Sequence, residues 1–191
     1  MKICYVTTIP ATIQSFILPL AEYLHENTDW DISFICSDDE KFEKSLPEYI
    51  NFYPVHMERG ISVAGVKAMF QIKKILKKEK FDMVQYSTPN ASLYTAMAAK
   101  FAKITVRLYC QWGIAYVGFN GLKRKIFKIV EKFVCGLSTC VQPDSKSNLN
   151  FARSEGLYSE KKSSVIWNGS ACGVSLDKFN VKRKNEYRSY I

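Results

Sequence analysis

Residues 81–102 have the sequence FDMVQYSTPNASLYTAMAAKFA, in which a short apolar stretch leads directly into an alanine-rich one. This pattern predicts a buried strand over residues 81–87 and a helix over residues 90–102. Similar pairs of a strand and a helix lie on both sides of it. Strands that alternate with helices of this length pair in parallel through right-handed crossovers, so the sequence predicts an α/β fold with a Rossmann-like, doubly wound parallel sheet.

The remaining predicted elements extend this pattern over most of the chain. Thr12 is expected to cap the first helix, and Pro19 is expected to kink it. Residues 1–180 should form one domain, and the charged residues 181–191 the start of a linker or tail. Further strands are predicted at residues 2–8, 30–37, 50–57, 105–111, 139–142 and 164–167, and further helices at residues 13–27, 62–80, 122–137 and 145–155.

The composition excludes several classes of protein. With 47% apolar and 24% charged residues, the chain is expected to fold around one core. No apolar run is long enough for a membrane span or a signal peptide, which favours a cytoplasmic protein. The six cysteines lack a CxxC motif and only two histidines are present, so we expect buried, reduced thiols and no metal site.

Charge is distributed unevenly along the chain. Residues 1–60 carry 4 basic and 10 acidic side chains, and residues 61–191 carry 23 basic and 8 acidic ones. The second part is therefore the one suited to a polyanion, which could be nucleic acid, an anionic membrane or a phosphorylated substrate. Nucleic-acid binding would need basic residues interleaved with exposed aromatic ones. That pattern is not evident, so we expect no nucleic-acid partner.

The loops that follow the predicted strands hold the candidate binding residues, because ligands of an open parallel sheet bind outside the carboxyl ends of its strands. None of these loops contains a dinucleotide-binding GxGxxG or a phosphate-binding GxxxxGK[ST] motif, which argues against an NAD-dependent enzyme and against an NTPase. The candidates are Thr8, Ile9, Pro10, Thr12, Ser87, Thr88, Asn90, Gln111, Trp112, Gly113 and Asp144.

Two of these residues admit two interpretations each. Trp112 is either an aromatic residue of the core or of a domain interface, or a platform on which a sugar stacks. Asp144 is either the cap of the helix predicted at residues 145–155 or a catalytic acid or base. His25 and His56 lie away from these loops, and no Ser/His/Asp arrangement is evident. The catalytic residues therefore stay unassigned.

The helix predicted at residues 122–137 is strongly amphipathic. Its apolar residues form one stripe, which we expect to pack against the sheet. Four basic residues fall on the opposite side, namely Arg124, Lys125, Lys128 and Lys132. That basic side is either a solvated face or a surface that contacts anionic lipid headgroups.

Three segments, in their order and spacing, resemble the N-terminal half of a GT-B fold glycosyltransferase of family 4, of the bacterial capsular and exopolysaccharide type. They are KICYVTTIP at residues 2–10, FDMVQYSTPNAS at residues 81–92, and VIWNGS with GVSLDKF at residues 165–179. The last is similar to the family's interdomain segment. Two positions depart from the family's pattern, since Trp112-Gly113 replaces a His-Gly pair and Thr8-Ile9-Pro10-Ala11 replaces a glycine-rich loop.

The resemblance implies a hexosyltransferase that moves a sugar, with retention, from a nucleotide-sugar donor to a saccharide acceptor, expected to be lipid-linked, in surface polysaccharide biosynthesis. It implies that this half holds the acceptor, that the nucleotide sugar is a co-substrate without a further cofactor, and that the protein is peripheral on the inner face of the membrane. The donor-binding domain is expected beyond Ile191 and so absent from this chain. We therefore expect the chain to be inactive alone and to self-associate through its exposed interdomain face.

A second class of protein fits the same residues. The chain could be a non-catalytic subunit that recruits a separate donor-binding chain to the membrane, as in two-chain glycosyltransferases. The Asn168-Gly169 segment favours the first interpretation, because a freestanding subunit needs no interdomain segment.

Overall fold

The structure, a computed structural model, describes residues 1–58, 60, 62–174, 176 and 179–189. Six parallel strands form one sheet in the order β3-β2-β1-β4-β5-β6, which confirms the predicted doubly wound sheet. The strands are β1 (Lys2–Val6), β2 (Asp31–Cys36), β3 (Ile50–Pro54), β4 (Met83–Tyr86), β5 (Val106–Gln111) and β6 (Cys140–Pro143).

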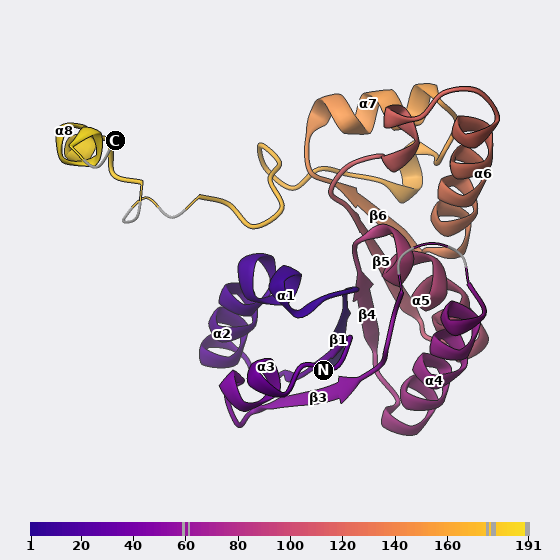
Figure 1. The fold of residues 1–191 in the computed structure, drawn as a ribbon, viewed down its shortest axis with the longest axis horizontal. Coiled ribbons are helices and arrows are strands. Elements are labelled where there is room, and N and C mark those ends of the chain that lie inside the picture. The colour runs from indigo at the N-terminus through magenta and orange to yellow at the C-terminus, as the bar shows by residue number, and fades with distance from the viewer. Residues whose placement is uncertain (59, 61, 175, 177–178, 190–191) are drawn as a thin grey trace.

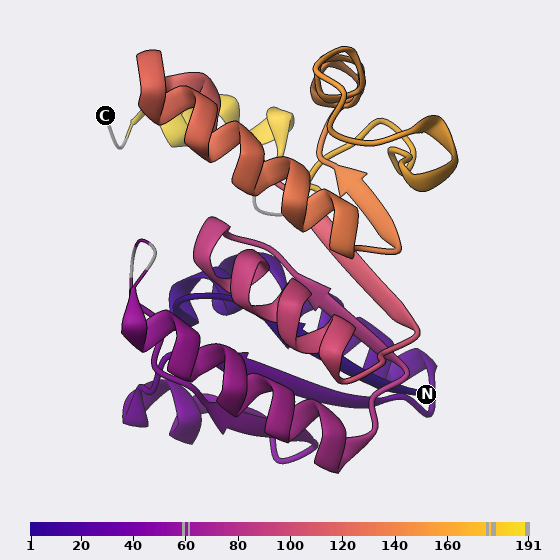
Figure 2. The same ribbon diagram turned by 90° about the vertical axis from the view of Figure 1, so that its right-hand side faces the viewer.

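Helices cover both faces of the sheet (Figures 1 and 2). One core cluster lies between β1, β2 and β3 and the helices α1, α2 and α3. The larger cluster lies beneath α4, α5 and α6, which pack side by side on the opposite face. The helices are α1 (Pro10–Phe16), α2 (Leu18–Asn27), α3 (Glu40–Ser45), α4 (Val63–Glu79), α5 (Pro89–Phe101), α6 (Gly121–Leu137), α7 (Lys146–Ser154) and α8 (Lys184–Arg188), with short 3-10 turns η1 (Ala115–Gly118), η2 (Glu160–Lys162) and η3 (Val181–Arg183).

The strand order reverses at the centre of the sheet. The chain builds outward from β1 to β2 and β3, then returns to the other side of β1 and continues through β4, β5 and β6. The register pairs Val6 of β1 with Ile35 on one side and with Tyr86 on the other. The loops after β1, β4 and β5 therefore meet at the carboxyl edge, at the reversal point where open α/β sheets bind ligands.

The first helix differs from the prediction at its start and in its middle. Pro10 occupies the first turn of α1, where its fixed φ and missing N–H are tolerated, so Thr12 lies inside the helix and does not cap it. The kink expected near Pro19 is a complete break at Ile17, and Pro19 lies in the first turn of α2. A short helix, α3, was not predicted from the sequence. Its start is capped by Asp39, whose carboxylate accepts a hydrogen bond from the Phe42 backbone N–H at 2.9 Å.

The prediction of a strand at residues 164–167 is wrong. Only a single bridge forms there, between Ser163 and Val141, and Trp167 is 89% exposed with a φ of +53°. After residue 170 the chain extends away from the body of the protein and ends in the separate helix α8 (Figure 1). Within the motif expected to be interdomain, residues 175, 177 and 178 lie outside the described part of the chain.

Four of the six cysteines are buried as expected: Cys4, Cys36, Cys110 and Cys135. Burial raises the pKa of the Cys36 thiol and of the Cys110 thiol to about 12. The prediction is wrong for Cys140 and Cys172, which are exposed, because Cys140 begins an edge strand and Cys172 lies on the extended segment. All six thiols are free.

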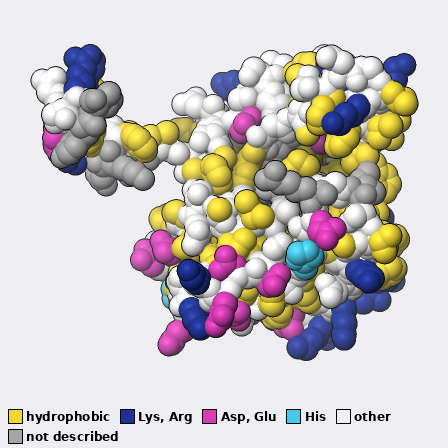
Figure 3. Space-filling model, viewed as in Figure 1, with side chains coloured by type: hydrophobic (Ala, Val, Ile, Leu, Met, Phe, Trp, Pro, Cys, Tyr) yellow, Lys and Arg dark blue, Asp and Glu magenta, His cyan; other side chains and the backbone are white. Residues whose placement is uncertain are grey.

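The uneven charge of the sequence becomes a separation on the surface. Figure 3 shows acidic side chains gathered at the lower left, over α2 and α3, and basic ones at the lower right, where α4 ends. The basic group at the end of α4 consists of Lys73, Lys74, Lys77 and Lys78. Within the described ranges, no helix combines the length and the apolar character that crossing a bilayer requires.

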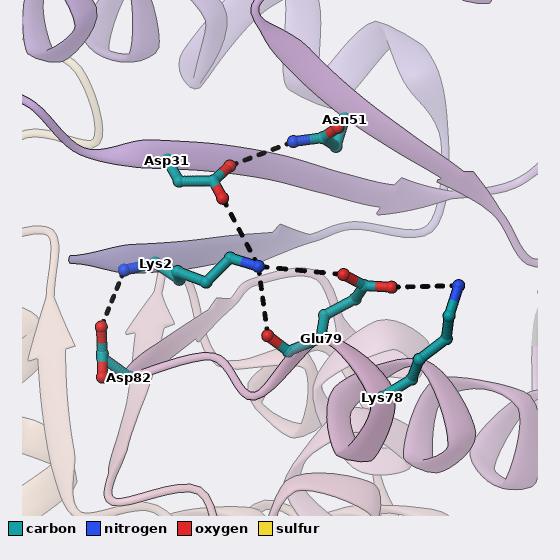
Figure 4. Close-up of polar contacts among 6 residues, drawn as sticks. All are labelled: Lys2, Asp31, Asn51, Lys78, Glu79 and Asp82. Carbon is teal, nitrogen blue, oxygen red and sulfur yellow. Dashed lines mark hydrogen bonds and ion pairs between the residues drawn. The ribbon is translucent and has the colours of Figure 1, made fainter.

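Polar contacts of Lys2 tie the amino edge of the sheet together (Figure 4). Its ammonium group lies 3.4 Å from the Asp31 carboxylate of β2 and 3.2 Å from the Glu79 carbonyl of α4, and its backbone N–H donates to Asp82 at 2.8 Å. Asn51 of β3 donates to the same Asp31 at 3.0 Å. This charged cluster lies opposite the carboxyl edge, so we assign it to the stability of the sheet.

Candidate functional site

Two adjoining hollows form a cleft at the carboxyl edge of the sheet. Their volumes are about 480 Å³ and about 380 Å³. Thr12, Thr88 and Pro89 line both, so the two hollows are continuous. The larger hollow is also lined by Phe16, Tyr109, Cys110, Trp112, Gly113, Ile114, Ala115 and Glu131, and the smaller one by Thr8, Ile9 and Asn90.

The structure brings most of the predicted strand-end residues together in this cleft. They come from the loops after β1, β4 and β5 and from the first turns of α1 and α5, and they comprise Thr8, Ile9, Thr12, Thr88, Asn90, Trp112 and Gly113. Pro10 lines a separate hollow between α1 and α3, together with Asp39 and Lys41. The topology therefore places Thr8 and Trp112 at one edge of the sheet, as the strand order requires.

Ser87 and Gln111 do not line the cleft, contrary to the prediction. Both are buried, because they still lie in the layer between the sheet and its helices, where each strand is ending. Gln111 accepts a hydrogen bond from the Tyr158 hydroxyl at 2.9 Å, and the Ser87 hydroxyl has no partner among the described residues. The two residues lie beneath the site rather than on its surface.

A pair of hydroxyl groups joins the loops after β1 and β4. The Thr8 and Thr88 side-chain oxygens are 2.8 Å apart, and the Thr8 backbone N–H donates to the Thr88 hydroxyl at 3.2 Å. Thr88 adopts a φ of +69°, which is unfavourable for a β-branched residue. Although Thr88 precedes α5, its side chain does not cap that helix. Its strained backbone instead directs the hydroxyl across the cleft, as strain at functional sites often does.

Trp112 is the largest of the aromatic residues that line the cleft. Its ring packs against Phe16 of α1 with 5.1 Å between the ring centroids, and the side chain is only partly buried. Gly113 follows with a φ of +139°, which allows the chain to turn immediately after the indole. The indole therefore lies at the margin of the core, with part of its surface open to the larger hollow.

Asp144 does not line the cleft and does not cap α7. Ser145 is the capping residue, since its hydroxyl accepts from the Asn148 backbone N–H at 3.2 Å. The Asp144 carboxylate instead accepts from the Asn148 side chain at 3.2 Å, and its carbonyl accepts from the Ser170 N–H at 2.6 Å. A Cβ atom at Gly169 would lie 2.2 Å from that carbonyl oxygen. Asp144 therefore anchors the segment that leaves the domain, and this contact requires glycine at position 169.

Glu131 is a residue of the cleft that the sequence did not indicate. It extends from α6 toward β5, where one carboxylate oxygen accepts hydrogen bonds from the Tyr109 hydroxyl at 2.9 Å and from the Gln111 amide. Burial raises the pKa of the Glu131 carboxyl, although these two hydrogen bonds oppose the shift. Such a carboxyl group at the floor of a cleft is a recognised mark of a functional site.

The amphipathic helix α6 meets the core with only part of its predicted apolar stripe, through Val130, Val134 and Leu137. The rest of the stripe faces outward, with Leu122 and Ile129 72% and 69% exposed. Together, Leu122, Ile126, Ile129 and Phe133 form what we call the α6 stripe, which faces outward.

The four basic residues predicted to share one side of α6 divide into two groups. Lys128 pairs with Glu155, the residue that follows α7, at 2.8 Å, and the Arg124 guanidinium lies 5.5 Å from the centre of the Tyr116 ring. These two residues are partly buried, so the prediction of one free basic face is wrong for them. Lys125 and Lys132 are exposed, and both lie along one side of the α6 stripe.

Taken together, a doubly wound parallel sheet with its cleft at the strand reversal defines a Rossmann-like ligand-binding domain. The sequence also assigns this domain to a protein family. Residues 2–145 match the model of the family described as "Glycosyl transferase 4-like". The chain belongs to this family.

Curated relatives are similar over nearly the whole chain. A capsular polysaccharide biosynthesis glycosyltransferase, CapM, from Staphylococcus aureus is 24% identical over 100% of this chain and 50% of its own length. An Escherichia coli α-1,3-galactosyltransferase that acts on GlcNAc-diphosphoundecaprenol is 28% identical over 94% of this chain and 46% of its own length. The chain thus spans about half the length of the curated relatives it matches.

Solved structures show the same fold. Anabaena HepE, in complex with UDP and glucose, is similar with a TM-score of 0.65 and 16% identity, over 100% of this chain and 50% of HepE. A UDP-N-acetylglucosamine 2-epimerase from Rickettsia bellii is similar with a TM-score of 0.66 and 20% identity, over 95% of this chain and 47% of the epimerase. The architecture is therefore that of one half of a GT-B fold.

Proposed function

We propose that this chain is the acceptor-holding half of a retaining hexosyltransferase, which moves a sugar from a nucleotide-sugar donor to a lipid-linked saccharide in surface polysaccharide biosynthesis. The observation that carries the proposal is the cleft, in which the hydroxyls of Thr8, Thr12 and Thr88 adjoin the open face of Trp112. An apolar surface with a few convergent polar groups is the composition of small-ligand sites. The nucleotide sugar acts as a co-substrate, and the proposal includes no further cofactor or metal.

The relatives support the chemical class of the acceptor. The E. coli relative and an N-acetylgalactosaminyltransferase from Campylobacter jejuni, 26% identical over 94% of this chain, are both named for acceptors linked to diphospho-undecaprenol. We carry the lipid-linked saccharide over to this chain as part of the proposal. The proposal keeps residues 1–180 as the acceptor domain and residues 181–191 as the start of a linker, although the chain already extends away from the body of the protein after residue 170.

Replacing Trp112 with alanine tests the acceptor site. We expect Trp112→Ala to weaken binding of a GlcNAc-diphospho-lipid with a shortened chain by about tenfold, because an aromatic platform contributes about 1–1.5 kcal/mol to such a contact. The free energy of unfolding should fall by less than the 3–5 kcal/mol that is lost when a fully buried tryptophan is replaced by alanine, because the indole is only partly buried. NMR titration gives the affinity and calorimetry gives the stability.

Trp30→Ala is the matched control for this experiment. Trp30 is also partly buried, but it lies before β2 at the amino edge, away from the cleft. The Trp30→Ala substitution should therefore leave acceptor binding unchanged. A stability loss in Trp112→Ala without a loss of affinity would assign Trp112 to the core and remove it from the site.

We further propose that the domain works in the cytoplasm, on the inner face of the membrane, through the α6 stripe and its flanking lysines. An apolar helix face bordered by lysines is the arrangement by which helices lie in the headgroup region of a bilayer. Glu131 is the single acidic residue of α6, and its side chain bonds toward β5, so no carboxylate of α6 itself opposes an anionic surface. This differs from the sequence prediction in that Arg124 and Lys128 support the helix while Lys125 and Lys132 meet the lipid.

Vesicle sedimentation tests this surface. The chain should bind phosphatidylglycerol-containing vesicles more tightly than neutral ones, and the attraction should fade as salt shortens the Debye length. Lys125→Gln with Lys132→Gln should weaken binding by about thirtyfold, at about 1 kcal/mol for each lysine near the surface. Lys73→Gln with Lys77→Gln on α4 removes the same charge elsewhere and should have little effect. Equal binding of all three proteins, or equal binding to neutral vesicles, would contradict the assignment.

Self-association is a further part of the proposal. Ile166, Trp167, Val174 and Leu176 are large apolar residues exposed near the segment that leaves the domain. Exposed apolar clusters of this kind commonly mark contact surfaces. We therefore propose that this face contacts a second domain or, where none covers it, a second copy of the chain.

A further inference from the structure

Glu131 occupies a distinctive position among the residues of the cleft. It lines both the 480 Å³ hollow and a neighbouring cavity of about 50 Å³, which Ser92 also lines. One carboxylate oxygen, Oε1, accepts both hydrogen bonds that the group receives. The other oxygen, Oε2, has no hydrogen bond to any residue that the structure describes. One acceptor atom of a largely buried carboxyl group is thus left for a ligand.

The neighbours of Glu131 hold the carboxyl group in one orientation. The Tyr158 hydroxyl donates to the side-chain oxygen of Gln111, Oε1, at 2.9 Å. This contact turns the side-chain N–H of Gln111 toward Glu131. Tyr109, two residues before Gln111 on β5, donates to the same Glu131 oxygen. Gln111 and Tyr109 are buried, so neither group is free to turn away. Fixed supporting groups of this kind make a polar contact selective.

The charge at the floor of the cleft is not balanced by a nearby cation. Among the described residues, no lysine or arginine lines either hollow of the cleft. The titratable groups that face Glu131 are Tyr109 on β5, Tyr116 on η1, Tyr158 after α7 and Cys135 on α6 itself. Burial raises the pKa of each, so all four stay neutral around pH 7. Glu131 therefore sets the electrostatic character of the larger hollow by itself.

We propose that Glu131 is a specificity residue, which accepts a hydrogen bond from a hydroxyl or amide group of an uncharged sugar ring lying against Trp112 and which excludes anionic sugars. This inference rests on the proposed function, since it assumes that the cleft holds the acceptor saccharide. A hydroxyl group satisfies the free carboxylate oxygen directly. A carboxylate or phosphate at the same place meets a like charge in a poorly solvated hollow, which is the repulsive element that selectivity needs.

The test compares two sugars that differ only at C6. Methyl N-acetylglucosaminide is neutral, and the corresponding uronide carries a carboxylate at C6 that stays ionised between pH 5 and pH 8. Binding is followed by NMR on the indole N–H of Trp112, which Trp112→Phe identifies. At pH 8 the chain should bind the neutral sugar at least about tenfold more tightly than the uronide. The ratio should shrink as the pH falls and Glu131 takes up a proton.

Glu131→Gln provides the decisive variant. Glutamine keeps an oxygen for Tyr109 and Gln111 but replaces the free carboxylate oxygen with an N–H donor. The preference for the neutral sugar should therefore fall to within about twofold and lose its pH dependence. Glu155→Gln is the control, because the Glu155 carboxylate pairs with Lys128 away from the cleft, and it should keep the preference of the unmodified chain.

The outcomes separate this inference from the proposal beneath it. If neither sugar moves the Trp112 signal, the acceptor assignment of the cleft fails, and the inference fails with it. If the neutral sugar binds but the uronide binds equally well, or if Glu131→Gln keeps the preference, only the role of Glu131 is overturned. If the variant does not fold, the pH dependence of the ratio in the unmodified chain decides the question, since a purely structural glutamate would leave that ratio constant.

Discussion

The 191-residue chain alone should transfer no measurable sugar from a nucleotide sugar to a lipid-linked acceptor, even where it binds the acceptor. The departing diphosphate needs fixed positive charge or aligned donors, and no lysine or arginine of the described residues lines the cleft. Holding donor and acceptor in contact accounts for about 7–11 kcal/mol of barrier reduction. Loss of that contribution lowers the rate by about five orders of magnitude or more, which places turnover below detection.

A panel of nucleotide sugars checks this expectation. Each is incubated with the purified chain and a GlcNAc-diphospho-lipid, and the products are separated by mass spectrometry. The E. coli galactosyltransferase relative, assayed in parallel with its own donor, shows that the acceptor is competent. Product formed by the chain at catalytic turnover would mean that the donor site lies within these 191 residues.

Gly65→Ala should be among the most destabilising single substitutions in the domain. A Cβ atom at Gly65 would lie 1.9 Å from the ring of Tyr94, which packs from α5 against the backbone of α4. The Tyr94 side chain is buried and cannot move aside. Its hydroxyl also donates to the Gly60 carbonyl at 3.1 Å and accepts from the Ser62 N–H at 3.3 Å. Overpacking and the loss of these bonds should together cost about 3 kcal/mol.

Differential scanning calorimetry measures this effect. A loss of about 3 kcal/mol corresponds to a melting temperature lower by about 6–12 °C in a domain of this size. Gly136→Ala is the matched control, since it also lies within a helix but has nothing within 4 Å of a new Cβ atom. That substitution should stabilise the protein slightly, because alanine favours helix more than glycine does. Similar melting temperatures for the two variants would show that α4 and α5 separate easily.

The strand and helix pattern of the sequence was sufficient for the sheet but not for the orientation of every helix. The alternation of elements required parallel pairing, and the strand-end loops met as that topology demands. In α6 the periodicity correctly grouped Leu122, Ile126 and Ile129 on one face. It could not establish which part of the apolar arc meets the core, because Phe127, Val130 and Val134 widen that arc on one side.

Glu131 was missed because the sequence did not show which face of α6 meets the core. It stands among five basic residues in a charged stretch, where a lone glutamate resembles a solvated side chain. Its spacing from Phe127 and Val134, four and three residues away, would have placed it on the inner face had that face been recognised. Asp144 shows the opposite error, because a carboxylate after a strand suggested chemistry and its neighbour Ser145 proved to be the cap.

The helix α6 presents Glu131 inward and the α6 stripe outward, on opposite sides of a single rod. An α-helix with its side chains is about 10–12 Å across, so a bilayer that holds the stripe would lie about that far from the pocket floor. The thickness of one helix would then act as a spacer between lipid headgroups and the bound sugar. A saccharide carried on a short diphosphate stem could reach the cleft without leaving its membrane, and a longer stem would overshoot it.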